Sequence, residues 1–157
     1  EENFEWICEV IASLDKCRAK FEIVIKAHPM ISLELRNKIK EKFGEKIKFT
    51  ENQVGLVSYQ ANLVILRHTS AILDAVCFGT PTIFYQKFTD HWLKRHPAKS
   101  HFLPFVKFLA EDVDALNQNL KSVVASISAG KNFDGIYASA KQQLSKENEF
   151  PRSWKLI

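Results

Sequence analysis

Two hydroxyl side chains and a carboxylate, at Thr69, Ser70 and Asp74, are the groups in this chain best suited to bind a phosphorylated ligand. They follow an apolar run, residues 63–66, that predicts a buried strand, and they open a predicted helix of about ten residues. A helix that begins there presents unpaired N–H groups and the positive end of its dipole, which suit phosphate. Ser70 and Asp74 share a helix face, so the carboxylate would reach a sugar hydroxyl. The alternative is that Thr69 and Ser70 only cap the helix and Asp74 only complements its dipole.

A second polar motif, His28-Pro29, ends another predicted strand. If both strands are parallel members of one sheet, the two motifs lie at the same edge and face a shared crevice. A histidine there can donate to a phosphate oxygen, and the proline fixes the turn that follows. Arg67 and His68 would add cationic donors, although Arg67 can equally point away. A purely structural role for His28-Pro29 is the alternative.

The elements that must position these residues alternate between helix and strand. Ser32 can cap one helix, and Gly79 followed by Pro81 ends another. Residues 51–62 are expected to be a connection with one helical turn at 56–59, and residues 86–104 form the longest irregular stretch. The order predicts an α/β fold, a three-layer, Rossmann-like, mostly parallel sheet with helices on both faces. The predicted strands are 21–27, 46–50, 63–66, 82–85 and 104–109, and the other predicted helices are 4–18, 32–43, 112–127 and 137–147.

Composition sets limits on the protein class without choosing a function. The chain has 157 residues, 46% of them hydrophobic and 25% charged, which is typical of one globular domain. The net charge of +4 suits nucleic acid, anionic lipid or a phosphorylated ligand equally. The three cysteines match no zinc or redox pattern, and each falls in a predicted helix, which indicates a reducing compartment. The first residues do not resemble a signal peptide, and the missing initiator methionine suggests a chain that is processed or cut from a larger protein.

The irregular stretch contains histidines and basic residues. His91, His96 and His101 are five residues apart and match no ligand pattern, so no metal site is expected. The basic and aromatic residues of the stretch would suit an anionic membrane or a glycan acceptor, and a solvated lid is the alternative. These residues are Lys87, Phe88, Trp92, Lys94, Arg95, Lys99 and Phe102.

Taken as a set, the motifs resemble the C-terminal, nucleotide-binding half of GT-B-type glycosyltransferases. The similarity covers roughly residues 20 to 90. The most similar groups carry a His-Pro and a Ser/Thr motif: bacterial sialyltransferases and polysialyltransferases, capsule Kdo transferases, and CDP-glycerol glycerophosphotransferases. The matching motifs are His28-Pro29, the run His68-Thr69-Ser70-Ala71-Ile72-Leu73-Asp74-Ala75, and the run Gly79-Thr80-Pro81-Thr82-Ile83-Phe84-Tyr85.

The resemblance implies an enzyme that uses a nucleotide-activated sugar for surface or capsular polysaccharide. It assigns the donor phosphate to His28, Thr69 and Ser70, with Arg67 and His68 as additional candidates. Asp74 would hold the ribose or sugar, although many relatives have glutamate there. The implied acceptor is a glycan or lipid-linked molecule, with no metal, no cofactor and no nucleic acid. The implied location is the cytoplasm, with peripheral contact at the inner face of the membrane.

The resemblance also predicts what this chain would lack. In such transferases the catalytic acid or base comes from an N-terminal domain, for which nothing in this sequence can stand in, so the catalytic residues are unknown. The opening strand of the C-terminal domain, expected before the helix at residue 4, is also not predicted. Residues 1–157 are therefore expected to be a single nucleotide-sugar-binding domain, a fragment of a larger two-domain transferase. Two other functions stay open. One is an enzyme like the non-hydrolysing UDP-N-acetylglucosamine 2-epimerases, which share the architecture, and the other is a non-catalytic α/β module whose basic residues, 87–107, bind an anionic partner.

Overall fold

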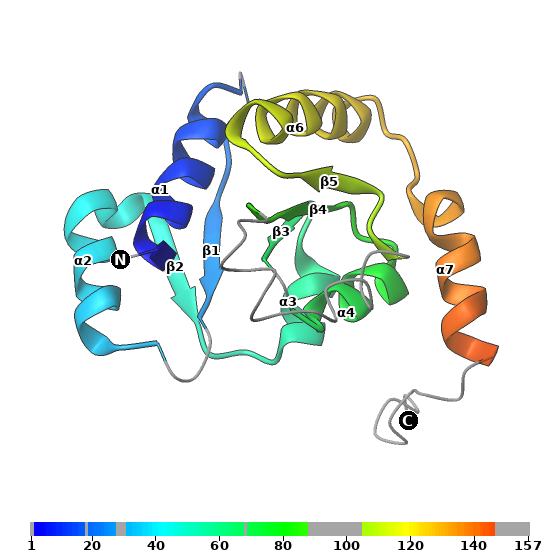
Figure 1. Cartoon of the computed structure of the whole chain (residues 1–157), viewed down its shortest axis with the longest axis horizontal. Coiled ribbons are helices and arrows are strands. Elements are labelled where there is room, and N and C mark those ends of the chain that lie inside the picture. Colours follow the sequence, from blue (N-terminus) through cyan, green and yellow to red (C-terminus); the bar gives the residue numbers. More distant parts are fainter. Residues whose placement is uncertain (1, 18, 28–30, 68, 88–104, 147–157) are drawn as a thin grey trace.

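The chain is an α/β fold with parallel strands flanked by helices, as predicted (Figure 1). The structure, a computed structural model, describes residues 2–17, 19–27, 31–67, 69–87 and 105–146. The described strands form two hydrogen-bonded sheets. In the first, β1 (Ile23–Lys26) pairs in parallel with β2 (Ile47–Thr50). In the second, all parallel, β4 (Thr82–Tyr85) lies between β3 (Val64–Leu66) and β5 (Phe108–Ala110).

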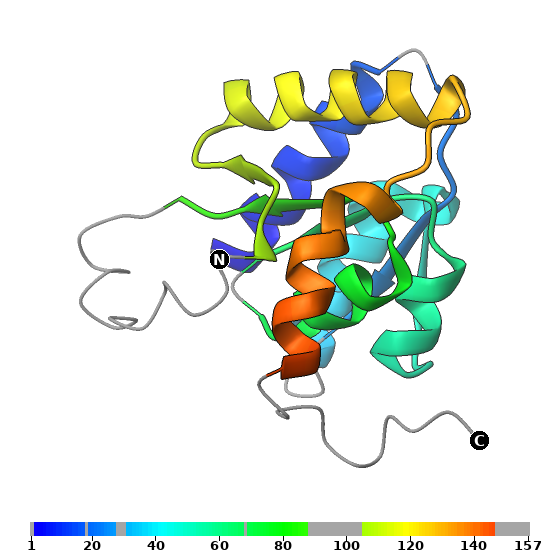
Figure 2. The ribbon, with the colours of Figure 1, turned by 90° about the vertical axis from the view of Figure 1, so that its right-hand side faces the viewer.

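Helices cover both faces of the three-stranded sheet, with α6 on one side and α4 on the other (Figure 2). α1 packs against α6, while α3 and α7 pack against α4. Because both faces are covered, β4 is buried at every residue, which explains its uninterrupted run of β-branched and aromatic side chains. The helices are α1 (Glu2–Asp15), α2 (Leu33–Phe43), α3 (Val54–Gln60), α4 (Ala71–Phe78), α6 (Val113–Ser128) and α7 (Asp134–Lys146), with a 3₁₀ turn η1 (Gly44–Lys46).

Two hydrophobic clusters form the core, and they meet at shared side chains. The larger cluster packs β4 residues such as Phe84 against Leu116 of α6 and Ile72 of α4. The smaller cluster joins α1, α2 and β2 beside the two-stranded sheet. Trp6 and Ile23 pack against both clusters. Side-chain packing, rather than strand pairing, therefore holds the two sheets together.

The helix signals predicted at Ser32 and Gly79 are confirmed, and the structure adds a cap at Asp112 that was not predicted. The Ser32 hydroxyl accepts a hydrogen bond from the Leu35 N–H at 3.2 Å, and the Asp112 carboxylate accepts one from the Ala115 N–H at 2.7 Å. Gly79 ends α4 in the left-handed conformation with φ of 70°. The two predicted signals are local in sequence, which is why the sequence alone reveals them.

Several elements differ from the expectation, and one of them is β5, which begins at Phe108 whereas the predicted strand was 104–109. Residues 51–62 contain a full helix, α3, in place of a single turn. α7 begins at Asp134, before the predicted start at residue 137. Cys17 lies just after the end of α1, where its N–H bonds to the Leu14 carbonyl, so it is not helical. Within the described ranges, none of the helices combines the length and apolar character needed to cross a bilayer.

One side-chain hydrogen bond ties α7 to the sheet. The Tyr137 hydroxyl accepts a hydrogen bond from the Thr82 N–H at 3.0 Å, and Tyr137 is fully buried. This N–H belongs to the first residue of β4. Burial raises the pKa of Tyr137, and its hydrogen bonds with Thr82 oppose that effect. The phenol thus satisfies a buried backbone donor that would otherwise be costly.

Candidate functional site

The turn between β3 and α4 contains Thr69 and Ser70, the two hydroxyl residues predicted to bind phosphate. Thr69 Oγ1 accepts a hydrogen bond from the Ala71 N–H at 3.3 Å, so Thr69 rather than Ser70 caps the start of α4. In the described part of the chain, the Ser70 side chain makes no cap hydrogen bond, and Ser70 is exposed. The Ser70 hydroxyl is therefore free of the cap and lies at the positive end of the helix.

Asp74, the predicted ligand of a ribose or sugar, lies one turn further along α4 and is 8% exposed. Its Oδ1 atom has no hydrogen-bond partner among the described residues. Burial raises the pKa of Asp74, and a hydrogen bond from its own backbone opposes that effect. A buried carboxylate oxygen without a donor costs about 1–3 kcal/mol or more, so a hydroxyl that donated to it would be stabilising.

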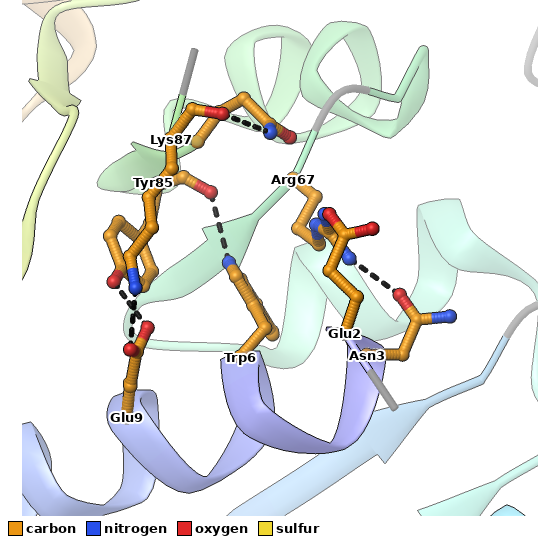
Figure 3. Close-up of polar contacts among 8 residues, drawn as sticks. Glu2, Asn3, Trp6, Glu9, Arg67, Tyr85 and Lys87 are labelled. Atoms are coloured by element: carbon orange, nitrogen blue, oxygen red, sulfur yellow. Dashed lines mark hydrogen bonds and ion pairs between the residues drawn. The ribbon is translucent and has the colours of Figure 1, made fainter. Parts of the chain in front are cut away.

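Arg67 follows β3, and its guanidinium is directed to the first turn of α1 (Figure 3). It donates to Glu2 Oε1 and to Asn3 Oδ1, each at 2.5 Å. The side chain of Glu2 is 78% exposed and that of Arg67 is 24% exposed. Because an exposed ion pair contributes little stability, an incoming anion could replace Glu2 at small cost.

His28 and His68 lie outside the described residues, so the structure does not place them. What it does describe is the strands that precede them. β1 and β3 belong to different hydrogen-bonded sheets, with no pairing between them among the described residues. The shared crevice that would bring residue 28 to residue 70 stays a prediction.

A charged network that the sequence did not reveal lies at the carboxyl end of β4 (Figure 3). The two carboxylate oxygens of Glu9, on α1, accept hydrogen bonds from the Tyr85 hydroxyl and from Lys87 Nζ, both at 2.5 Å. The Trp6 indole N–H donates to the Tyr85 carbonyl at 3.0 Å, and the two rings stack with centroids 5.9 Å apart. α1 is thereby fixed across the ends of β3 and β4, next to Arg67.

The pKa values of this network follow from its contacts. Burial alone would raise the pKa of Glu9, but the hydrogen bonds from Lys87 and Tyr85 outweigh it and bring the pKa below its ordinary value. Burial and the hydrogen bond to Glu9 both raise the pKa of Tyr85. Lys87, one of the basic residues considered for a solvated lid or for contact with a membrane or glycan, thus forms an ion pair with Glu9. The only sequence signal was a tyrosine at the end of a buried strand, whose hydroxyl needs a partner.

Metal binding has no support in the described residues, which contain no group of three or more His, Cys, Asp or Glu side chains able to hold an ion. The histidines His91, His96 and His101 lie outside these residues. Among the described residues of the segment 67–74, three groups can contact a ligand. They are the Arg67 guanidinium, the Ser70 hydroxyl at the start of α4, and the buried Asp74 Oδ1, which can accept a hydrogen bond from a ligand hydroxyl. Such a set suits a ligand with both phosphate and hydroxyl groups. No model of a known protein family, no curated protein and no solved structure matches this chain.

Proposed function

We propose that this chain is the donor-binding part of a GT-B-type glycosyltransferase or glycerophosphotransferase, and that the nucleotide-activated donor binds at the turn between β3 and α4. The observation that carries the proposal is the Ser70 hydroxyl, exposed and free of the helix cap. It lies at the N-terminal end of α4, the next element after the parallel strand β3, where the positive end of the helix dipole favours an anion. In the free protein the N–H groups of Ala71, Ile72 and Leu73 bond to Thr69 and Ser70, so the proposal rests on the hydroxyl and the dipole.

Asp74 supports the same assignment through its unpaired Oδ1. A carboxylate repels phosphate, so the diphosphate would bind at the first turn of α4 and a ribose or sugar hydroxyl would donate to Asp74. Hydroxyl donation to the ionised carboxylate lowers its pKa, which burial raises in the free protein. Binding is therefore stronger to the ionised form, and affinity should increase with pH as Asp74 loses its proton.

The chemistry we propose is displacement at the activated carbon of the donor, without a metal. Donors at the helix start, with Thr69, Ser70 and His28, would stabilise the negative charge that develops on the departing phosphate. Arg67 would add a cation once its pair with Glu2 opens. The N-terminal half would supply the catalytic acid or base. The acceptor would be a glycan or lipid-linked molecule. The reaction would take place in the cytoplasm, at the inner face of the membrane. The product would be a surface or capsular polysaccharide.

Calorimetric titration of the folded chain with CMP, CDP and UDP tests the proposal. We expect Ser70→Ala to weaken binding of the diphosphates about tenfold, the loss of one hydrogen bond to a charged group. Asp74→Asn should weaken binding and remove its pH dependence. The matched control is Ser128→Ala, an exposed serine at the end of α6. No binding of any of the three nucleotides at millimolar concentration would end the proposal.

A further inference from the structure

Strands β1 and β3 have the sequences of central strands, but they are exposed as edge strands are. Residues 23–25 and 63–66 are uninterrupted apolar runs, the pattern of strands that are covered on both faces of a parallel sheet. β4 has such a run and is buried at every residue, with a strand on each side of it. By contrast, no residue of β1 or β3 is fully buried, and Val24 is 45% exposed. Both strands therefore lack a neighbour that their sequences require.

The pairing of the described strands shows on which side the neighbour is missing. β1 pairs with β2 alone and β3 with β4 alone, so each has one unpaired edge. Val24 lies in register with Lys48 of β2 and on the same face, and the Lys48 side chain is 68% exposed, as suits an outer strand. Ile23 of β1 and Ile65 of β3 pack against the same hydrophobic cluster, and β1 lies between β2 and β3 in Figure 1. The two unpaired edges form the β1–β3 seam.

The backbone of β3 shows which groups the seam presents. The Val64 N–H donates to the Pro81 carbonyl at 2.9 Å, on the side of β4. Successive residues of a strand direct their N–H and C=O groups to opposite edges, so those of Ile65 are directed away from β4. An open edge of this kind pairs readily with another strand.

The course of α1 shows where such a strand would join the chain. Arg67, which directly follows β3, bonds to Glu2 at the start of α1. Asp15, at the end of α1, bonds to Lys46, which directly precedes β2. α1 therefore runs from the carboxyl end of β3 back to the end of the sheet where β2 begins, which is the course of a helix that connects two parallel strands. β1 is the strand that follows this helix, and the seam beside β3 is where the strand before it would lie.

We propose that the β1–β3 seam accepts a further strand, parallel to both neighbours and joined directly to the start of α1. Its backbone bonds to Ile65 on one side and to β1 on the other. The two described sheets then become one, in the order β2, β1, added strand, β3, β4, β5. Helices cover both faces of such a sheet, so the added strand is rich in β-branched apolar residues. Any parallel α/β sheet would need this strand, whether or not the chain belongs to a transferase.

Hydrogen exchange measured by nuclear magnetic resonance tests the inference, on the chain as it stands and on the same chain extended at residue 1. The probe is an extension of about six alternating valine and isoleucine residues with a short Gly-Ser connection to α1. Ile65 is the reporter, and Val64, whose N–H is already bonded, is the internal control. We expect Ile65 to exchange at least about tenfold faster than Val64 in the native chain and at a similar rate to Val64 in the extended chain.

Two controls separate strand pairing from a general effect of the extension. An extension of the same length with proline at every second position lacks the N–H groups of a central strand and should leave the Ile65 rate unchanged. The valine-isoleucine extension should also raise the urea midpoint of unfolding, and Val24→Ala should reduce that rise, because the added strand covers this side chain. Leu109→Ala is the matched substitution, since Leu109 is 36% exposed on β5, at the far edge of the other sheet, and should leave the rise unchanged.

Three results would overturn the inference. The first is an Ile65 N–H as protected as that of Val64 in the native chain, because another part of the chain or a second copy would then fill the seam. The second is an unchanged Ile65 rate in the extended chain, with folding verified in the same spectra. The third is equal protection of Ile65 by the proline-containing extension.

Discussion

Glu9→Gln offers a direct test of how α1 is fixed to the end of β4. The glutamine retains an oxygen that can accept from Tyr85 but loses the charge. A hydrogen bond to a charged group contributes about 1.5–3 kcal/mol and a neutral one about 0.5–1.5 kcal/mol. The lost ion pair to Lys87, whose side chain is 48% exposed, adds at most about 1 kcal/mol. We therefore expect the free energy of unfolding to fall by about 1–2 kcal/mol at neutral pH.

The same substitution should change how stability depends on pH. The pKa of Glu9 lies below its ordinary value of 4.5 in the folded chain, so the unfolded chain binds the proton more readily. The contribution of Glu9 is complete above about pH 4.5 and is lost as the pH falls through its folded pKa. The stability difference between native and Glu9→Gln proteins should accordingly shrink on acidification.

Urea unfolding followed by circular dichroism, at neutral pH and at about pH 3.5, measures both effects. Glu5→Gln is the matched control, because Glu5 lies exposed on the same helix. If Glu9→Gln and Glu5→Gln lose the same stability, the network contributes nothing measurable. If the cost of Glu9→Gln is equal at both pH values, the account of the Glu9 pKa is wrong.

Two further tests, a substitution at Tyr137 and a matched pair of substitutions at Gly79 and Gly130, concern the packing around α4 and β4. Tyr137→Phe leaves the buried Thr82 N–H without its acceptor and should cost about 1–3 kcal/mol in urea unfolding; a cost below about 0.5 kcal/mol would contradict the role of this bond. Gly79→Ala and Gly130→Ala both place a Cβ on left-handed backbone, with φ of 70° and 68°. Each should lower the free energy of unfolding by about 1–2 kcal/mol. Only the first also meets the Asp134 side chain, so thermal unfolding should show the larger loss for Gly79→Ala, and equal losses would contradict the contact.

The sequence predicted the parts of the fold that local patterns encode. β4 was predicted with its observed bounds because its β-branched and aromatic run begins directly after a proline. The structure buries this strand at every position. α3 was underestimated, because its short apolar pattern gains its support from α4. There Tyr59 packs edge-on against Phe78, with ring centroids 5.4 Å apart, a contact that no local pattern reveals.

In the candidate site, too, the sequence predicted the features that depend on neighbouring residues and missed those that depend on distant ones. The position of Thr69 and Ser70 at the start of α4 follows from strand and helix signals that lie next to each other. The direction of Arg67 and the partner of Tyr85 do not, because Glu2 is 65 residues from Arg67 and Glu9 is 76 residues from Tyr85. Only the tertiary arrangement shows that polar side chains of α1 contact the strand ends.

The attachment of α1 has a consequence for how the chain folds during synthesis. α1 leaves the ribosome before β4 does, because the acceptor for the Trp6 indole is 79 residues further along the chain and Lys87 is 78 residues beyond Glu9. The hydrogen bonds that fix α1 to the end of β4 therefore cannot form until Lys87 has emerged, although α2 and β2, which cover part of its apolar face, emerge earlier. A nascent chain stalled before residue 85 should expose α1 to proteases and chaperones, whereas one stalled well after Lys87 should protect it.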